Sequence, residues 1–221
     1  MLRRYDYHWL TLVLVLQLGM LTLDIPGRWT DVGSLVLAPL MAVLLAGITG
    51  RRRDLWILLV LGFTPPLLDL VVPWHSSGLL LNLLKVTLWS AGPVFLATRL
   101  FSTIYYADPV RHHELAGAIS IYLLLAYFFA GLYEAVYLYD PTSLWFGSSF
   151  ADASIGFGEI LYFSFVTLAT LGYGDVAPAH PATRAIAVAE AIMGLLYMAV
   201  LVARFVSLMT LHEPRTRPPE E

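Results

Sequence analysis

Six long apolar stretches constrain this chain more than any other feature. They are separated by short polar segments and run over residues 8–23, 32–49, 55–72, 79–100, 115–137 and 183–211. A helix that crosses the hydrocarbon core of a bilayer needs roughly 20 apolar residues. Only 13% of the 221 residues are charged, whereas a soluble domain has about a quarter. The pattern predicts an all-α membrane protein with six transmembrane helices.

The first apolar stretch has two interpretations. Arg3 and Arg4 precede it, as they would in a signal peptide, but no small-x-small cleavage site follows before Pro26. We therefore expect an uncleaved first span.

A seventh apolar stretch, residues 157–169, is too short to cross a bilayer. Non-helical backbone at membrane depth is tolerated only inside protein or beside water. We therefore predict a re-entrant half-helix between spans five and six, followed by an irregular loop in a protected or wet place.

The loop that follows this half-helix carries the most specific motif, Thr-Leu-Ala-Thr-Leu-Gly-Tyr-Gly-Asp over residues 167–175. Its core, residues 170–174, resembles the TVGYG selectivity filter of the tetrameric potassium channel family, with one substitution. The alternative is an ordinary Gly-Tyr-Gly turn. The resemblance implies that the Thr170 hydroxyl and successive carbonyls replace the water shell of K⁺. Those carbonyls belong to Thr170, Leu171, Gly172 and Tyr173. Gly172 and Gly174 suit the left-handed backbone this needs.

The resemblance extends over residues 115–211 as outer helix, pore helix, filter and inner helix. It implies that Tyr162, Thr167 and Asp175 support the filter, with a hydrogen bond between Tyr162 and Asp175. The alternative for Tyr162 is an aromatic side chain at the membrane interface. Val166 stands where some members have a glutamate, so the buried carboxyl pair of those members is not expected.

The inner helix is expected to begin near Thr183, whose hydroxyl could cap it. Gapless counting from the filter places Gly194 at the family's inner-helix hinge; the alternative is a glycine that only allows close packing. Helical spacing then directs a set of side chains toward the cavity or gate. These are Leu195, Met198, Val202, Ala203 and Val206.

Glu190 is an ionisable residue inside an apolar helix, which is a functional hypothesis by default. It could face water behind the filter, bond a pore-helix hydroxyl such as that of Ser164 or Thr167, or be protonated. Both a gating role and a purely structural role stay open.

The expected domains are a four-helix transmembrane domain (residues 1–100), a cytoplasmic interfacial linker (101–114), a pore domain (115–211) and a disordered tail (212–221). The layout resembles six-span channels of the prokaryotic type. The fourth span carries only Lys85 and Arg99 instead of a ladder of charges, so strong voltage sensing is not expected. Asp69 is the expected partner of Lys85.

The distribution of Lys and Arg predicts the orientation. With the N-terminus inside, ten arginines face the cytoplasm and two face outward. Both termini are therefore expected to be cytoplasmic, in a plasma (inner) membrane. The expected partners are membrane lipids and three further copies of the chain, because one chain has one filter segment; no nucleic acid is expected.

The predicted function is passive, potassium-selective conduction, with K⁺ ions in the filter and no organic cofactor. We expect a channel and not an enzyme. The alternatives are a regulatory or non-conducting channel subunit and a component of a K⁺ uptake transporter.

Overall fold

The computed structural model describes residues 6–22, 40, 43–44, 52–71, 78–105, 113–148 and 155–211. Its elements in chain order are α1 (Asp6–Thr22), α3 (Arg52–Val71), α4 (Leu79–Tyr105), α5 (His113–Tyr139), the 3₁₀ helix η3 (Pro141–Ser143), β1 (Leu144–Phe146), α6 (Phe157–Leu168), β2 (Val176–Pro178) and α7 (Pro181–Leu211). Within these ranges the regular elements are helices, apart from two three-residue strands.

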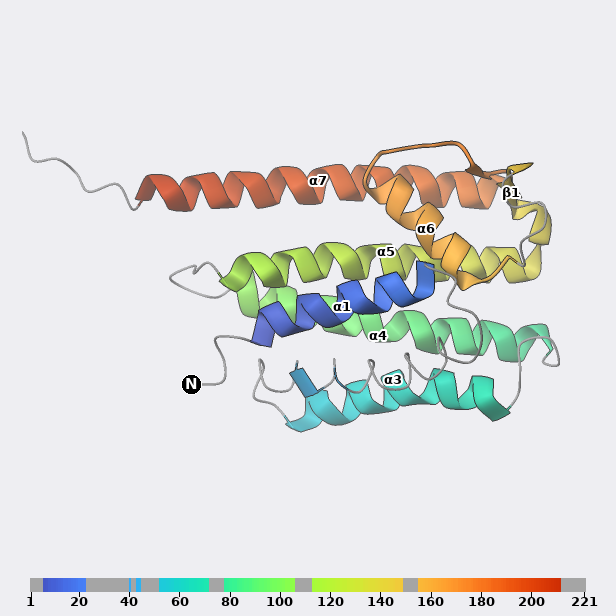
Figure 1. Ribbon diagram of the computed structural model, residues 1–221, viewed down its shortest axis with the longest axis horizontal. Coiled ribbons are helices and arrows are strands. Elements are labelled where there is room, and N and C mark those ends of the chain that lie inside the picture. Colours follow the sequence, from blue (N-terminus) through green and yellow to red (C-terminus); the bar gives the residue numbers. More distant parts are fainter. Residues whose placement is uncertain are drawn as a thin grey trace, which may run out of the picture.

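The helices lie in layers around α5 (Figure 1). α5 contacts α1, α4, α6 and α7, and α3 packs against α4 on the far side from α7. In the most apolar stretch of α5, 61% of the residues are buried, whereas only 11% are buried in that of α7. α5 is thus the central helix among those described, whereas most of the surface of α7 is exposed in a single chain.

Among the described residues, three helices are long and apolar enough to cross a membrane: Leu79–Ser102, Leu115–Tyr139 and Pro181–Arg204. Two shorter apolar helices are Tyr7–Gly19 and Phe157–Leu168. Every predicted span except residues 32–49 coincides with a described helix. Most of that stretch lies outside the described residues. Its three described residues, Leu40, Val43 and Leu44, are helical. The count of six spans stays a prediction.

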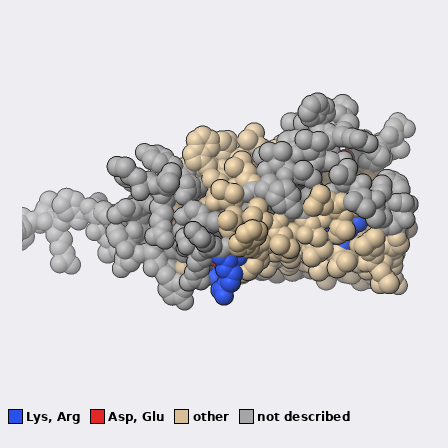
Figure 2. All heavy atoms as spheres, turned by 90° about the horizontal axis from the view of Figure 1, so that it is seen from below, with Lys and Arg blue, Asp and Glu red and all other residues tan. Residues whose placement is uncertain are grey.

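The face seen in Figure 2 fits a lipid environment. Its described atoms belong almost entirely to uncharged residues, with isolated Lys and Arg side chains among them. Charged side chains are costly in the hydrocarbon region, so such a surface is what a bilayer permits.

Aromatic side chains join α4, α5 and α6. Trp89 meets Phe157 edge-on, with ring centroids 4.4 Å apart, and Tyr127 lies 5.8 Å from Trp89. Tyr133 packs edge-on against Phe163 at 4.9 Å. Such pairs stabilise packing by about 0.5–1.5 kcal/mol each beyond the area they bury. They fix α6 against the central helix.

Two expectations need correction. The strands β1 and β2 were not predicted; they pair antiparallel with Trp145 opposite Ala177, because the segments that flank α6 are brought together on its outer side. The predicted linker 101–114 is also too long. α4 continues as a helix to Tyr105 and α5 begins at His113, since the apolar pattern does not stop at residue 100. Residues 106–112 and the tail 212–221 lie outside the described residues.

Candidate pore loop

The helix α6 delivers the motif at its C-terminal end. Its first turn is closed by the Glu159 carboxylate, which accepts the N–H of Gly156 at 2.8 Å. At the other end, Thr170 N–H donates to the Thr167 carbonyl at 3.0 Å and Leu171 N–H donates to the Val166 carbonyl at 2.9 Å. The segment 170–174 therefore starts directly on the last turn of α6, and Thr167 supports it through its backbone.

The backbone of this segment alternates. Thr170, Gly172 and Gly174 have φ of 57°, 58° and 76°, while Leu171 and Tyr173 between them are not in the left-handed region. A Cβ built on either glycine would meet nothing within 4 Å, so glycine is required by conformation and not by space. The predicted left-handed glycines are confirmed. For Thr170, which has a Cβ, this conformation costs roughly 1–2 kcal/mol.

Such alternation has a chemical consequence. It turns successive carbonyl oxygens to one side of the chain and successive N–H groups to the other. Among the described residues, no group donates a hydrogen bond to the carbonyls of residues 170–174. All five residues are exposed in a single chain. A row of five unpaired carbonyls is therefore available for a ligand that needs oxygen.

Asp175, directly after this row, is held on several sides. Its Oδ2 accepts the Tyr162 hydroxyl at 2.7 Å, its Oδ1 accepts the N–H of Val176 at 3.0 Å, and its carbonyl accepts the N–H of Gly147 at 2.8 Å. The predicted Tyr162–Asp175 hydrogen bond is confirmed. It raises the pKa of Tyr162 to about 12, because the neutral phenol is the donor.

The start of α7 is bound to η3, which follows α5, through one carbonyl, that of Ser143. It accepts the N–H groups of Ala179 (2.9 Å) and His180 (3.2 Å) and the hydroxyl of Thr183 (2.8 Å). The predicted cap at Thr183 is wrong. The helix begins at Pro181, and the His180 Nδ1 accepts the N–H of Ala182 at 3.1 Å, so Thr183 already lies inside the first turn and donates instead.

Glu190 lies on α7 and is fully buried. Its Oε2 accepts the Tyr133 hydroxyl of α5 at 2.7 Å, and its Oε1 lies 2.5 Å from the Ser164 Oγ of α6. The predicted contact with the Ser164 hydroxyl is confirmed. Tyr133, the second partner, was not foreseen, because no sequence spacing relates α5 to α7.

Gly194 lies one turn further along α7, against the end of α6. A Cβ at this position would collide with the backbone carbonyl oxygen of Leu168. α7 runs as one helix through this position. The structure therefore supports the close-packing interpretation of Gly194.

The five predicted cavity or gate residues all follow Gly194 on α7. Leu195 is 60% exposed, Met198 45%, and Val202 and Val206 are each 55% exposed. Ala203 is exposed as well. These side chains are therefore largely exposed in a single chain.

Comparison with known protein families identifies the chain. The family model described as an ion channel matches residues 93–211, more than half of the 221 residues. This chain belongs to the ion channel family. Comparisons with curated proteins and with solved structures gave no significant match.

The matched part of this ion channel comprises the second half of α4 together with α5, α6, the alternating segment and α7. It therefore contains every residue placed in the pore loop above. The channel is a membrane protein, and its pore loop lies between its last two long apolar helices.

An ion pair that sequence reasoning missed joins α3, which precedes the matched region, to α4. Arg99 Nη2 on α4 lies 3.3 Å from Asp54 Oδ1 on α3, and Asp54 is fully buried. No sequence spacing relates Asp54 to Arg99. Lys85 is also buried, at 1% exposure. Its predicted partner Asp69 has a side chain outside the described residues.

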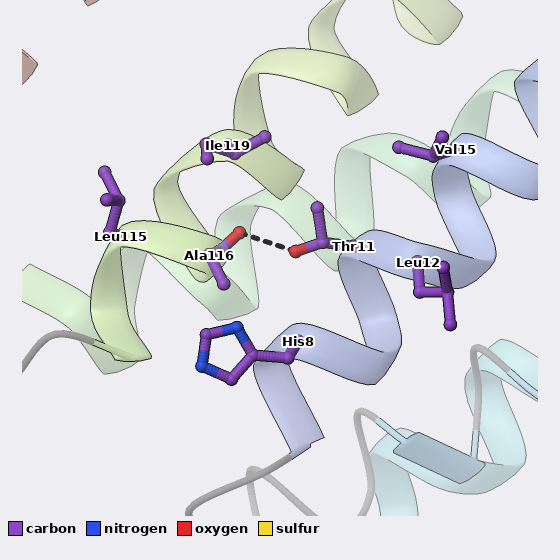
Figure 3. A pocket seen from close by; sticks show the side chains of 7 residues that line it. All are labelled: His8, Thr11, Leu12, Val15, Leu115, Ala116 and Ile119. Atoms are coloured by element: carbon purple, nitrogen blue, oxygen red, sulfur yellow. Dashed lines mark hydrogen bonds between the residues drawn. The ribbon is translucent and has the colours of Figure 1, made fainter.

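A groove of about 370 Å³ lies between α1 and α5, away from the pore loop (Figure 3). In this groove the Thr11 hydroxyl of α1 donates to the Ala116 carbonyl of α5 at 2.9 Å, and His8 lies at the edge of the groove. Its walls are otherwise aliphatic. None of the predicted filter or gate residues lines this groove.

Proposed function

We propose that this ion channel is selective for potassium and that residues 170–174 are its filter. The observation that carries the proposal is the alternating left-handed backbone at Thr170, Gly172 and Gly174, with the intervening carbonyls unpaired. Potassium filters replace the hydration shell of the ion with rings of backbone carbonyls. Thr170, Leu171, Gly172 and Tyr173 would supply those oxygens, and the Thr170 hydroxyl would complete the innermost ring.

The filter requires four copies of the chain around one axis. One chain brings one strand of carbonyls, and a ring of oxygens needs several strands. The exposure of apolar side chains supports this assembly: Leu171 is 55% and Tyr173 is 65% exposed in a single chain. Large apolar groups are seldom left in the open without a partner surface. A homotetramer would cover them, with membrane lipids around its rim.

The orientation follows from the arginines. Both termini lie in the cytoplasm and the pore loop opens outward, in a plasma membrane. Asp140 and Asp175 then lie near the outer mouth, where negative charge raises the local concentration of cations. At the inner end, rings of Met198, Val202 or Val206 form a hydrophobic constriction that gates by dewetting.

The decisive experiment is a reversal potential. The full chain is reconstituted in liposomes with potassium on one side and sodium on the other. We expect current to reverse close to the potassium equilibrium potential. Reversal near zero would refute selectivity, and absence of current would favour a non-conducting subunit.

A matched pair of glycine variants locates the filter. Gly172→Ala places a Cβ on a left-handed residue and should abolish selective conduction. Gly92→Ala, inside α4, meets nothing within 4 Å and should leave the reversal potential unchanged. Equal behaviour of the two variants would exclude residues 170–174 as the filter.

A further inference from the structure

Glu190 joins the three helices that surround the pore loop. It belongs to α7, its two hydrogen-bond partners are Tyr133 on α5 and Ser164 on α6, and all three side chains are buried. Ser164 lies on α6, which ends at Leu168, two residues before Thr170. A change in the protonation of Glu190 would therefore act on α6, and so on the pore loop, through the Ser164 side chain alone.

The hydrogens of this cluster can be counted. The Ser164 Oγ lies 2.8 Å from the Ala126 carbonyl oxygen and 2.5 Å from the Glu190 Oε1. A carbonyl can only accept, and a hydroxyl has one hydrogen to give. If Ser164 donates to Ala126, an ionised Glu190 would face the lone pairs of Ser164 at a short distance. If Ser164 donates to Glu190, its contact with the Ala126 carbonyl has no hydrogen.

One assignment satisfies every contact. Glu190 carries a proton on Oε1 and donates it to Ser164, Ser164 donates to the Ala126 carbonyl, and Tyr133 donates to Oε2. We propose that Glu190 is a neutral carboxylic acid that positions α6 against α5 and α7. Each hydrogen then has one acceptor, and no unpaired charge is left in the membrane interior, where charge is costly.

The surroundings of Glu190 are otherwise uncharged. The titratable groups that interact with it electrostatically are Tyr122 and Tyr133, both on α5. Tyrosine is neutral at physiological pH. Among the described residues of α6 and α7, no further titratable group acts on Glu190. The proton is therefore held by the cluster itself and not by a neighbouring anion.

For the proposed potassium channel, this assignment gives a direction for pH dependence. Alkaline pH removes the proton on Oε1. The Ser164 hydroxyl can then donate either to Glu190 or to the Ala126 carbonyl, but not to both. One of the links between α6 and its neighbours is then lost. Conduction should fall as pH rises, because the helix below the filter is less well held.

Infrared spectroscopy of the reconstituted full chain tests the protonation directly. At neutral pH we expect the carbonyl stretch of a protonated carboxylic acid that is absent in Glu190→Gln. The band should shift in Tyr133→Phe, because the acid's carbonyl loses its donor. If no protonated acid disappears on Glu190→Gln, the proposal is wrong, whether or not the protein conducts potassium.

Conduction tests the positioning role. Glutamine can donate to Ser164 and accept from Tyr133, so Glu190→Gln should conduct like the parent at neutral pH. The parent should lose about tenfold in open probability at alkaline pH, as expected for the loss of one hydrogen bond between neutral groups, and Glu190→Gln should not. Identical pH profiles of parent and variant would overturn the proposal, while the reversal potential separately tests potassium selectivity.

Discussion

The two halves of the channel hold their buried carboxyl groups in different ways. In the pore half, Glu190 is bound by the hydroxyls of Tyr133 and Ser164. In the N-terminal half, Asp54 is paired with the Arg99 guanidinium at 3.3 Å. Short hydroxyl bonds demand close alignment, whereas an ion pair tolerates displacement. The difference indicates that helix positions are fixed most closely around the pore loop.

The same comparison bears on voltage sensing. Arg99 is already engaged with Asp54 and packs over the Phe95 ring at 4.9 Å, and Lys85 is buried within α4. A charge that crosses the full membrane field contributes about 2.3 kcal/mol per 100 mV. With so few charges on α4, and Arg99 held by Asp54, the N-terminal half is suited to support and not to strong sensing. That role stays a prediction.

The largest expected effect comes from Gly194→Ala. The new Cβ would meet the Leu168 backbone carbonyl, which cannot rotate away, so α6 and α7 must separate. Overpacking of this kind costs about 1–3 kcal/mol, and we expect both a lower melting temperature and loss of conduction.

Alanine substitutions at two other glycines serve as comparisons for Gly194→Ala. Gly131→Ala on α5 would meet the Ser90 side chain, which can change rotamer, and Gly92→Ala meets nothing. The melting temperatures should fall in the order Gly92→Ala, Gly131→Ala, Gly194→Ala, from highest to lowest. An equal loss in all three variants would show that packing at the pore loop is no tighter than elsewhere.

An intermediate effect is expected from Arg99→Gln. It leaves the buried Asp54 carboxylate without its cation. The cost should lie at the lower end of about 1–3 kcal/mol, because Arg99 is partly exposed. Thermal unfolding should occur earlier, while the reversal potential stays that of the parent.

The double variant Asp54→Asn with Arg99→Gln is the control. It removes the unpaired charge and should recover most of the lost stability. A change in ion selectivity in either variant would contradict the separation of the two halves.

The smallest effect is expected from Tyr162→Phe, which removes the hydrogen bond to Asp175 and costs about 0.5–1.5 kcal/mol. Filter closures should become more frequent in single-channel records. The Tyr162 pKa of about 12 lies above its ordinary value. The contribution of this bond is therefore constant below about pH 10 and lost only as pH rises through the folded pKa.

Parent and Tyr162→Phe should consequently show parallel pH profiles between about pH 6 and 9. Profiles that diverge in this range would mean that Tyr162, and not Glu190, couples protonation to conduction.

The sequence was sufficient for features that depend on local pattern. Apolar length predicted the helices to within a few residues, as for 183–211 against Pro181–Leu211. The motif predicted the left-handed glycines and the Tyr162–Asp175 bond. A bond from Glu190 to Ser164 was one of three alternatives that the sequence left open, and the structure selects it.

Features that depend on tertiary placement escaped it. The pairing of β1 with β2, the Asp54–Arg99 ion pair and the three donors on the Ser143 carbonyl join segments with no common periodicity. The left-handed Thr170 was also missed, because threonine normally avoids that conformation. The intrinsic backbone preference of threonine disfavours this conformation, which the surrounding structure therefore has to stabilise.

The bonds at Ser143 also make α7 a lever. Its N-terminal end is held at Thr183, so a tilt of α7 would pivot there. At about 1.5 Å of rise per residue, Glu190 lies roughly 10 Å and Leu211 roughly 42 Å from that pivot. A tilt that moves the C-terminal end of α7 by about 4 Å would shift Glu190 by only about 1 Å. Motion at the C-terminal end is thus reduced at Glu190 to a displacement that a single hydrogen bond can register.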